Sequence, residues 1–228
     1  MSVTAPAFLT GLTPPALQQL GKQRLQPAAA AAYWQMHQAA AAAGIDIAIA
    51  SSYRDFAAQA RIWQAKLAGQ RPVFDLSEQQ IDIGKLDDRA KLYAIMHFSA
   101  LPGASRHHWG TDFDVYDKAA VASDYQLQLT PAEYAAGGPF AHLDRWLSKN
   151  AARFGFFRPY RQYRGGVAIE PWHLSYWPLA TNYQAQLTAV QVLEACTSAK
   201  LMREDLLKNE INEIMQRYVL NICEGTDE

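Results

Sequence analysis

Two short stretches of the chain hold the residue types of a metal-dependent hydrolase. Residues 105–114 read SRHHWGTDFD, and residues 170–173 read EPWH. Zinc binds imidazole nitrogen and carboxylate oxygen, and a catalytic zinc ion keeps its fourth position for a water molecule. A glutamate that does not bind the metal can take the proton of that water and hand it to a departing amine. The two stretches therefore supply what zinc-dependent hydrolysis of an amide bond requires.

Local geometry indicates which side chains can share one ion. Side chains two apart on a strand share a face, and the chain around Asp114 has the pattern of a strand, so Asp114 can point at the metal. Gly110 permits a tight turn that would fold His107 back over the same face. We predict that His107, Asp114 and His173 bind the metal and that Glu170 is the general base.

The spacing of Glu170 and His173 predicts an irregular backbone between them. Residues three apart on an ideal strand face opposite sides. Pro171 cannot donate a hydrogen bond to a neighbouring strand, so we expect a bulge or a late strand start. His108 is the alternative to His107 as a ligand. The remaining histidines lack carboxylates at a useful spacing and are interpreted as structural, namely His37, His97 and His142.

The elements that must position these residues alternate between helices and short strands. An alanine-rich segment predicts a helix that Gly44 ends, and Asp55 can cap a second helix. We expect strands at 45–49, at 111–116 and, after a hairpin turn at Gly165-Gly166, at 167–169. We expect helices at 28–43, 55–69, 86–98, 140–154 and 182–221, and a loop at 70–84. We predict an α+β fold in which a small, mainly antiparallel sheet carries a zinc site, flanked by helices.

The chain is expected to divide near residue 180. Residues 1–180 would form the catalytic domain with an extended N-terminal arm, and residues 181–228 a C-terminal helical extension packed on it. The extension carries apolar residues at helical spacing, and such a face packs on another surface. We therefore expect a monomer, with a homodimer through these helices as the alternative.

Composition excludes several classes of protein. The chain has 228 residues, half of them hydrophobic, and a formal net charge of −1. The sequence has no basic stripe of the kind that binds nucleic acid, and no apolar run long enough to span a membrane. The first cationic side chain is Lys22, so a secretory signal is not recognised; we expect a cytoplasmic location, with the periplasm as the alternative. Cys196 and Cys223 are expected to be reduced thiols rather than a disulfide.

Three separated blocks together resemble a known family. The pattern Ser-x-His-x-x-Gly-x-x-x-Asp, followed by Glu-Pro-Trp-His, is similar to that of the zinc D-alanyl-D-alanine carboxypeptidases and dipeptidases of the vancomycin-resistance type. These enzymes belong to one superfamily with lysostaphin-like and hedgehog-like domains. The resemblance runs from about residue 48 to 178. It includes Ser52-x-Arg54 with Gln59 downstream, Leu-Pro-Gly before Ser105, and Trp-His-Leu-Ser-Tyr after Glu170.

The resemblance implies a role for individual residues. His107, Asp114 and His173 fall on the zinc ligands, Glu170 on the general base, and Arg54 on the arginine that steadies the oxyanion of the tetrahedral intermediate. Substrate-binding positions follow as well: Gln59 and Ser105 near the C-terminal end of the substrate, with Trp172 beside them. One residue departs from the pattern, because Asp112 stands where the family usually has a small residue. It could support a ligand histidine from behind or reshape the substrate cavity.

The expected function is zinc-dependent D,D-peptidase activity. The substrate would be the D-Ala-D-Ala terminus of peptidoglycan stem peptides, or the free dipeptide, and a peptidoglycan endopeptidase of the same superfamily is the alternative. A non-haem iron oxygenase is a remote alternative, because His142 and Asp144 have the local spacing of its ligands. A non-catalytic binding module is another, although Glu170 and Arg54 argue against it.

Overall fold

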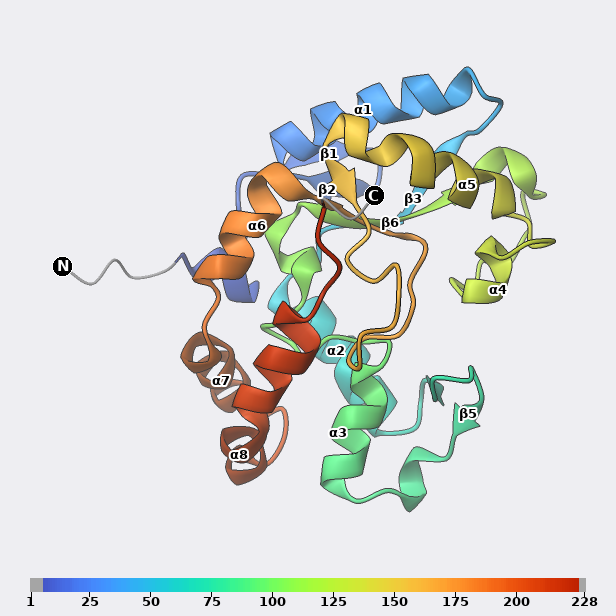
Figure 1. The fold of residues 1–228 in the computed structure, drawn as a ribbon. Helices are drawn as coiled ribbons and strands as arrows, with labels where there is room; N and C mark the ends of the chain where they lie inside the picture. Colours follow the sequence, from blue (N-terminus) through green and yellow to red (C-terminus); the bar gives the residue numbers. More distant parts are fainter. Residues whose placement is uncertain (1–5, 226–228) are drawn as a thin grey trace.

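An antiparallel sheet with the strand order β3-β6-β8-β7 lies at the centre of the fold (Figure 1). The structure, a computed structural model, describes residues 6–225. The sheet consists of β3 (Ile47–Ser51), β6 (Asp112–Asp117), β8 (His173–Tyr176) and β7 (Phe156–Phe157). Two antiparallel hairpins stand apart from it, β1 (Gln18–Leu20) with β2 (Gln23–Leu25) and β4 (Val73–Phe74) with β5 (Gln80–Ile81). The predicted α+β fold with a small antiparallel sheet is confirmed.

Two helices cover one face of this sheet (Figure 1). α1 (Pro27–Ala41) and α5 (Ala141–Asn150) share a core cluster with the apolar side chains of β6. Phe113 and Val115 are fully buried in that cluster. Because side chains alternate along a strand, Asp112 and Asp114 emerge on the opposite face, outside this cluster.

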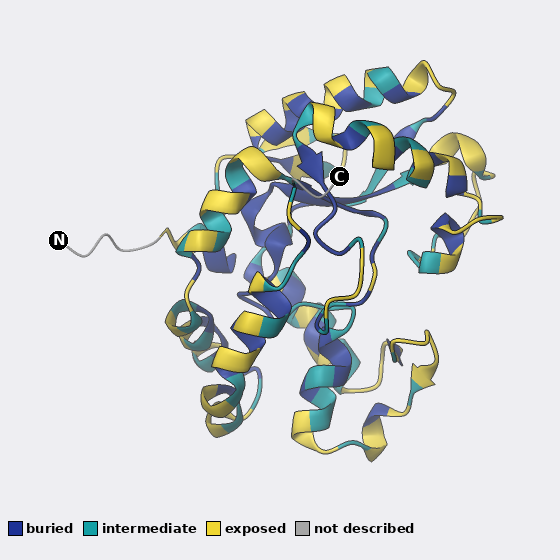
Figure 2. Cartoon of the chain, viewed as in Figure 1, coloured by how far each residue is buried: buried dark blue, intermediate teal, exposed yellow. Residues whose placement is uncertain are grey.

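A second core cluster joins the middle of the chain to its C-terminal part. α2 (Phe56–Leu67) and α3 (Asp88–Met96) pack in it with α6 (Trp177–Gln186), α7 (Ala189–Ser198), α8 (Glu204–Ile214) and a π-helical segment, η6 (Met215–Leu220). Buried and exposed residues alternate along α7, α8 and η6 (Figure 2). Ala180 lies inside α6 and is fully buried. The division of the chain near residue 180 stays a prediction.

Short helical turns connect these elements. They are η1 (Ala7–Thr10), η2 (Ile83–Lys85), η3 (Arg106–Trp109), η4 (Lys118–Ala120), α4 (Pro131–Tyr134) and η5 (Ala151–Phe154). The two cysteines are buried and unpaired, as expected. Within residues 6–225, no helix has the length and apolar character needed to cross a membrane.

Three local expectations are wrong. The predicted loop 70–84 contains the β4–β5 hairpin, and the N-terminal arm contains the β1–β2 hairpin. No strand forms at 167–169. Gly166, just before it, packs against η6 instead of turning a hairpin, since a Cβ on Gly166 would collide with the carbonyl oxygen of Arg217. Ala168 N–H then bonds the carbonyl oxygen of His97 at 2.8 Å rather than a strand.

Candidate metal centre

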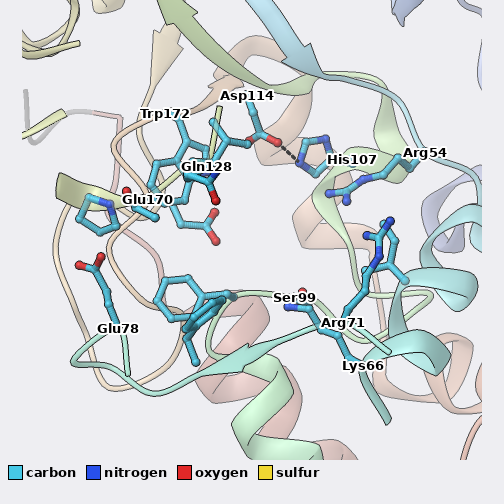
Figure 3. Close-up of a pocket in the computed structure, with 16 residues that line it drawn as sticks. Arg54, Lys66, Arg71, Glu78, Ser99, His107, Asp114, Gln128, Glu170 and Trp172 are labelled. Atoms are coloured by element: carbon cyan, nitrogen blue, oxygen red, sulfur yellow. Dashed lines mark hydrogen bonds and ion pairs between the residues drawn. The ribbon is translucent and has the colours of Figure 1, made fainter. Parts of the chain in front are cut away.

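Three side chains that are distant in the sequence meet on the face of the sheet opposite α1. The possible ligand atoms of His107, Asp114 and His173 all lie within 4.8 Å of one another, and we call these residues the metal triad. His107 Nε2 is 3.4 Å from Asp114 Oδ2, and His173 Nδ1 is 3.1 Å from Asp114 Oδ1. All three residues are buried. Figure 3 shows His107 and Asp114 facing each other at one end of a cavity.

Strand pairing and a tight turn bring the triad together. In the antiparallel register of β6 and β8, Asp114 is the direct partner of His173, so their side chains emerge next to each other. η3 ends at Trp109 and is followed by Gly110, whose φ is 68° and where a Cβ would lie 2.8 Å from Leu17. Glycine tolerates both the left-handed conformation and the close approach. The turn brings His107 over the same face of the sheet.

Glu170 lies beside the triad because β8 starts late. β8 begins at His173, and the residues before it form a turn in which His173 N–H donates to the carbonyl oxygen of Glu170 at 3.2 Å. Glu170 N–H donates to the carbonyl oxygen of Tyr160 at 3.0 Å. Glu170 Oε2 therefore lies 3.6 Å from His173 Nδ1. The late strand start that Pro171 predicts is confirmed.

The second ring nitrogen of each triad histidine has its own hydrogen-bond acceptor. His107 Nδ1 is 2.9 Å from the carbonyl oxygen of Ser52, and His173 Nε2 is 3.2 Å from Asp112 Oδ1. Such an acceptor holds a proton on one ring nitrogen and leaves the lone pair of the other for a metal. Asp114 Oδ1 is buried without a hydrogen-bond partner. Two imidazoles oriented in this way and one carboxylate fit a zinc ion.

Asp112 supports His173 from behind. Its carboxylate also accepts a hydrogen bond from Arg106 Nε at 2.7 Å, and Arg106 donates further to Gln184 at 2.6 Å and to Ser175 at 2.7 Å. Burial opposes ionisation of Asp112, but the Arg106 charge, together with His173 and the Thr111 hydroxyl, holds the pKa of this carboxyl below its usual range. Of the two explanations for this unusual residue, the contacts favour support of a ligand histidine over a wall of the substrate cavity.

Burial acts differently on the ionisable groups of the site. It lowers the pKa of His107 to about 3 and raises the pKa of Glu170 to about 7. Burial also opposes the charged form of His173, but the nearby carboxylates of Asp112 and Asp114 raise its pKa to about 9. His173 thus holds a proton between two carboxylates, and binding of a metal cation there would release it.

Arg54 reaches the triad from the turn between β3 and α2. Its backbone N–H donates to the carbonyl oxygen of His107 at 3.2 Å, and Asp55 caps α2, as predicted, by accepting from Ala58 N–H at 2.7 Å. Arg54 Nε is buried without a hydrogen-bond partner, and burial lowers the pKa of the guanidinium. Figure 3 shows Arg54 beside His107. The guanidinium can therefore donate to an anionic oxygen near the triad.

Two cavities meet at the triad. The larger has a volume of about 390 Å³ and the smaller about 50 Å³. Arg54, His107 and Glu170 line both cavities. Gln59 and Ser105 line the smaller one and are both 1% exposed. These two residues, predicted to lie near the C-terminal end of the substrate, thus share a narrow space on one side of the triad.

The larger cavity has Trp172 in its wall. The Trp172 ring packs on Tyr134 with the ring centroids 5.7 Å apart, which fixes its orientation. Other parts of the wall come from α2, from the β4–β5 hairpin, and from residues 98–99 and 128–131. All the residues predicted to act in the site therefore line one of the two cavities or belong to the triad.

Several residues that line these cavities were not among the predicted site residues, and three of them carry polar side chains close to the site. Tyr160 lines the smaller cavity with its ring centroid 5.0 Å from that of His173, and Lys66 and Arg71 line the larger one. Lys66 lies seven residues after Gln59, which is two turns along the same side of α2. That spacing could have found Lys66. No local pattern points to Arg71 or Tyr160, because tertiary packing brings both to the site.

Two alternatives raised by the sequence lie outside the triad. His108 Nδ1 is 2.7 Å from the carbonyl oxygen of Arg54, and His108 Nε2 accepts from Gly103 N–H at 3.1 Å, so both ring nitrogens are engaged. His142 is exposed on α5, and neither it nor Asp144 belongs to the metal-binding group found in the described part of the chain. His142 and Asp144, the pair on which the iron-oxygenase alternative rested, therefore give it no support.

Known proteins resemble this chain in sequence and in fold. Residues 22–179 match the family model VanY, D-alanyl-D-alanine carboxypeptidase. An uncharacterized protein of Haemophilus influenzae is 34% identical over 122 residues, which cover 53% of this chain and 93% of that protein. The solved structure of VanYB in complex with D-alanine-D-alanine has a TM-score of 0.53 at 24% identity and covers 81% of this chain and 89% of VanYB.

A second solved structure holds the metal expected here. It is a glutamate-to-alanine variant of the vancomycin-resistance D,D-pentapeptidase VanY from a VanB-type cassette, in complex with Zn(II). Its TM-score is 0.52 at 26% identity, with 80% of this chain and 90% of that chain covered.

Proposed function

The chain belongs to the VanY family of D-alanyl-D-alanine carboxypeptidases and is a metallopeptidase, and we propose that it is a zinc-dependent D,D-peptidase. The proposed substrate is a peptidoglycan stem peptide that ends in D-Ala-D-Ala, from which the terminal D-alanine is released. One observation carries the proposal above the others: three ligand side chains converge within 4.8 Å, and Glu170 lies beside them.

The proposed ligands of the zinc ion are His107, Asp114 and His173. Zinc, when bound, lowers the pKa of a coordinated water to about 7 and polarises a carbonyl. Glu170 accepts a proton from the attacking water at its carboxylate and passes it to the nitrogen of the leaving amine. Arg54 donates hydrogen bonds to the carbonyl oxygen as that oxygen becomes anionic. Its Nε has no protein partner, so it is free to do so.

The two cavities support release of one small residue. The smaller cavity would take the terminal D-alanine, and the larger one the peptide that precedes it. Gln59 Nε2 donates to the carbonyl oxygen of Ala100 at 2.7 Å, which leaves Gln59 Oε1 buried and unpaired for a substrate N–H. An endopeptidase would need room for a chain on both sides of the scissile bond. A free dipeptide would leave most of the larger cavity unfilled.

Peptide hydrolysis followed by mass spectrometry tests this proposal. The zinc-loaded protein should release free D-alanine from a pentapeptide that ends in D-Ala-D-Ala, and more slowly from the free dipeptide. Removal of zinc with a chelator should abolish the release, and added zinc should restore it. A matched pentapeptide ending in L-Ala-L-Ala controls for stereochemistry. Cleavage within the peptide without release of D-alanine would instead indicate an endopeptidase.

A further inference from the structure

Two cations line the larger cavity away from the metal triad. Lys66 lies near the end of α2 and Arg71 in the segment after it, and Figure 3 shows both on the same side of the cavity as Arg54. Lys66 Nζ donates a hydrogen bond to Ser99 Oγ at 2.7 Å. Within the part of the chain that the structure describes, neither Lys66 nor Arg71 forms an ion pair with a carboxylate.

The protein environment disfavours the charge on Lys66. Burial is the main cause that lowers the pKa of Lys66 to about 8; Arg54 and Arg71 act in the same direction, and Glu170 opposes them. Glu78 lies across the cavity in Figure 3 and forms no ion pair with either cation. A cation held in this way without an anionic partner is costly, so a substrate anion that enters the cavity would be stabilised there.

The position of Lys66 along α2 indicates which part of a peptide it would meet. Gln59, Ile62 and Lys66 line the cavities from one side of the helix. An α-helix rises about 1.5 Å per residue, so Gln59 and Lys66 are roughly 10 Å apart along its axis. An extended peptide rises about 3.3 Å per residue, so this distance spans about three residues. With the terminal residue beside Gln59, Lys66 lies beside a residue two or three positions earlier.

We propose that Lys66 and Arg71 form a subsite for a side-chain carboxylate of the substrate, located upstream of the scissile bond. The inference rests on the proposed function and adds a substrate class to it. The enzyme would prefer stem peptides whose third residue is a diamino acid with a second carboxylate over peptides with lysine at that position. An ammonium and a guanidinium that converge on one carboxylate give charge-assisted hydrogen bonds, which are stronger than neutral ones.

A matched pair of pentapeptides tests this subsite. The two peptides are identical except for the third residue, which is diaminopimelic acid in one and lysine in the other, so both keep a side-chain amine and only one has the carboxylate. The ratio of kcat/KM for D-alanine release should favour the diaminopimelic peptide by about tenfold or more. Calorimetric Kd values with the zinc-loaded Glu170→Gln variant should show the same ratio without turnover.

Variants of Lys66 and Arg71 test whether these two residues cause the preference for the diaminopimelic peptide. The double variant Lys66→Met, Arg71→Gln should bring the ratio close to one, and Arg71→Gln alone, at an exposed position, should lower it in part. Lys149→Met, which replaces an exposed lysine on α5, is the matched control and should keep the ratio. Circular dichroism checks that each variant is folded.

Two results would overturn the subsite. One is an equal rate and affinity for both peptides with the unaltered protein. The other is a double variant that keeps the kcat/KM ratio but binds both peptides more weakly by the same factor. That pattern would mean that the cations bind the C-terminal carboxylate, which both peptides share. If neither peptide releases D-alanine, the proposed function fails, and the ratio of the two Kd values still decides whether the subsite exists.

Discussion

The metal centre and the outer wall of the larger cavity are built on different kinds of backbone. Asp114 and His173 lie on β6 and β8, which are the two inner strands of the sheet. The outer wall comes from the β4–β5 hairpin, whose strands have two residues each, and from residues 128–131. Glu78 and Leu129 in these segments have positive φ values of 60° and 53°. The hairpin also exposes apolar side chains, among them Phe74 at 37% and Leu76 at 44%.

This difference separates the chemistry of the site from its selectivity. Residues on inner strands have their backbone held by hydrogen bonds on both sides, which suits ligands that must keep a fixed geometry. Exposed connecting segments tolerate substitution and insertion more readily. Changes at the metal centre should therefore remove the reaction, whereas changes at the cavity wall should alter which peptide is accepted.

Replacement of the proposed base should have the largest effect. We expect Glu170→Gln to lower kcat by about 10²- to 10⁴-fold, because the carboxylate that moves the proton is lost. Zinc content, measured by mass spectrometry of the metal, should stay the same, since Glu170 is not a proposed ligand. Glu194→Gln on the exposed side of α7 is the matched control. Unchanged hydrolysis by Glu170→Gln would rule out the proposed mechanism.

Loss of the arginine beside the triad should have the next largest effect. Arg54→Met should lower kcat by about 10²- to 10³-fold, which is typical of the loss of one donor to a developing oxyanion. Arg54→Lys should recover part of the rate because it keeps the charge. Steady-state kinetics on the D-Ala-D-Ala pentapeptide provides the measurement. An effect confined to KM would instead assign Arg54 to substrate binding.

Asp112 offers a test of the support behind the metal ligands. Asp112→Asn should weaken zinc binding by about 10- to 100-fold, since it alters the hydrogen bond that orients His173. Competition with a chelator measures this affinity. The same change leaves Arg106 buried without its carboxylate, and urea unfolding should show a loss of about 3–5 kcal/mol.

Ser175→Ala is the control that separates these two effects. It removes a hydrogen bond of Arg106 and leaves the contact between Asp112 and His173 in place. We expect it to lower the free energy of unfolding while zinc affinity stays near that of the unaltered protein. If Asp112→Asn binds zinc with full affinity, then Asp112 serves only the fold.

The pH dependence of peptide preference should show the smallest effect. Lys66 is charged below its pKa of about 8 and neutral above it, so the preference for the diaminopimelic peptide should decline as the pH rises through about 8. Charged groups that act on Lys66 are Glu170, Arg54 and Arg71. The ratio of kcat/KM for the two peptides cancels titrations that affect both equally, including that of Glu170. A ratio that stays constant from pH 6 to pH 10 would mean that the Lys66 charge has no part in the preference.

Much of the site follows from local signals in the sequence. Gly110 predicts the turn that returns His107 to the sheet, and Pro171 predicts the late start of β8. The two signals are reliable because glycine widens, and proline narrows, the range of conformations of its own backbone regardless of the rest of the fold. The predicted hairpin at Gly165-Gly166 is wrong for a related reason. A glycine pair also allows close approach of another segment, and here that segment is the C-terminal helix.

The turns beside the metal triad and the alternation that points Asp114 away from the core follow from the amino-acid sequence, because they depend on neighbours along the chain. The contact between Asp112 and His173, and the lining of the cavities by Lys66, Arg71 and Tyr160, arise only when distant segments pack together. A cavity wall is assembled from segments brought together by burial of apolar surface, and no short stretch of sequence records which segments will meet.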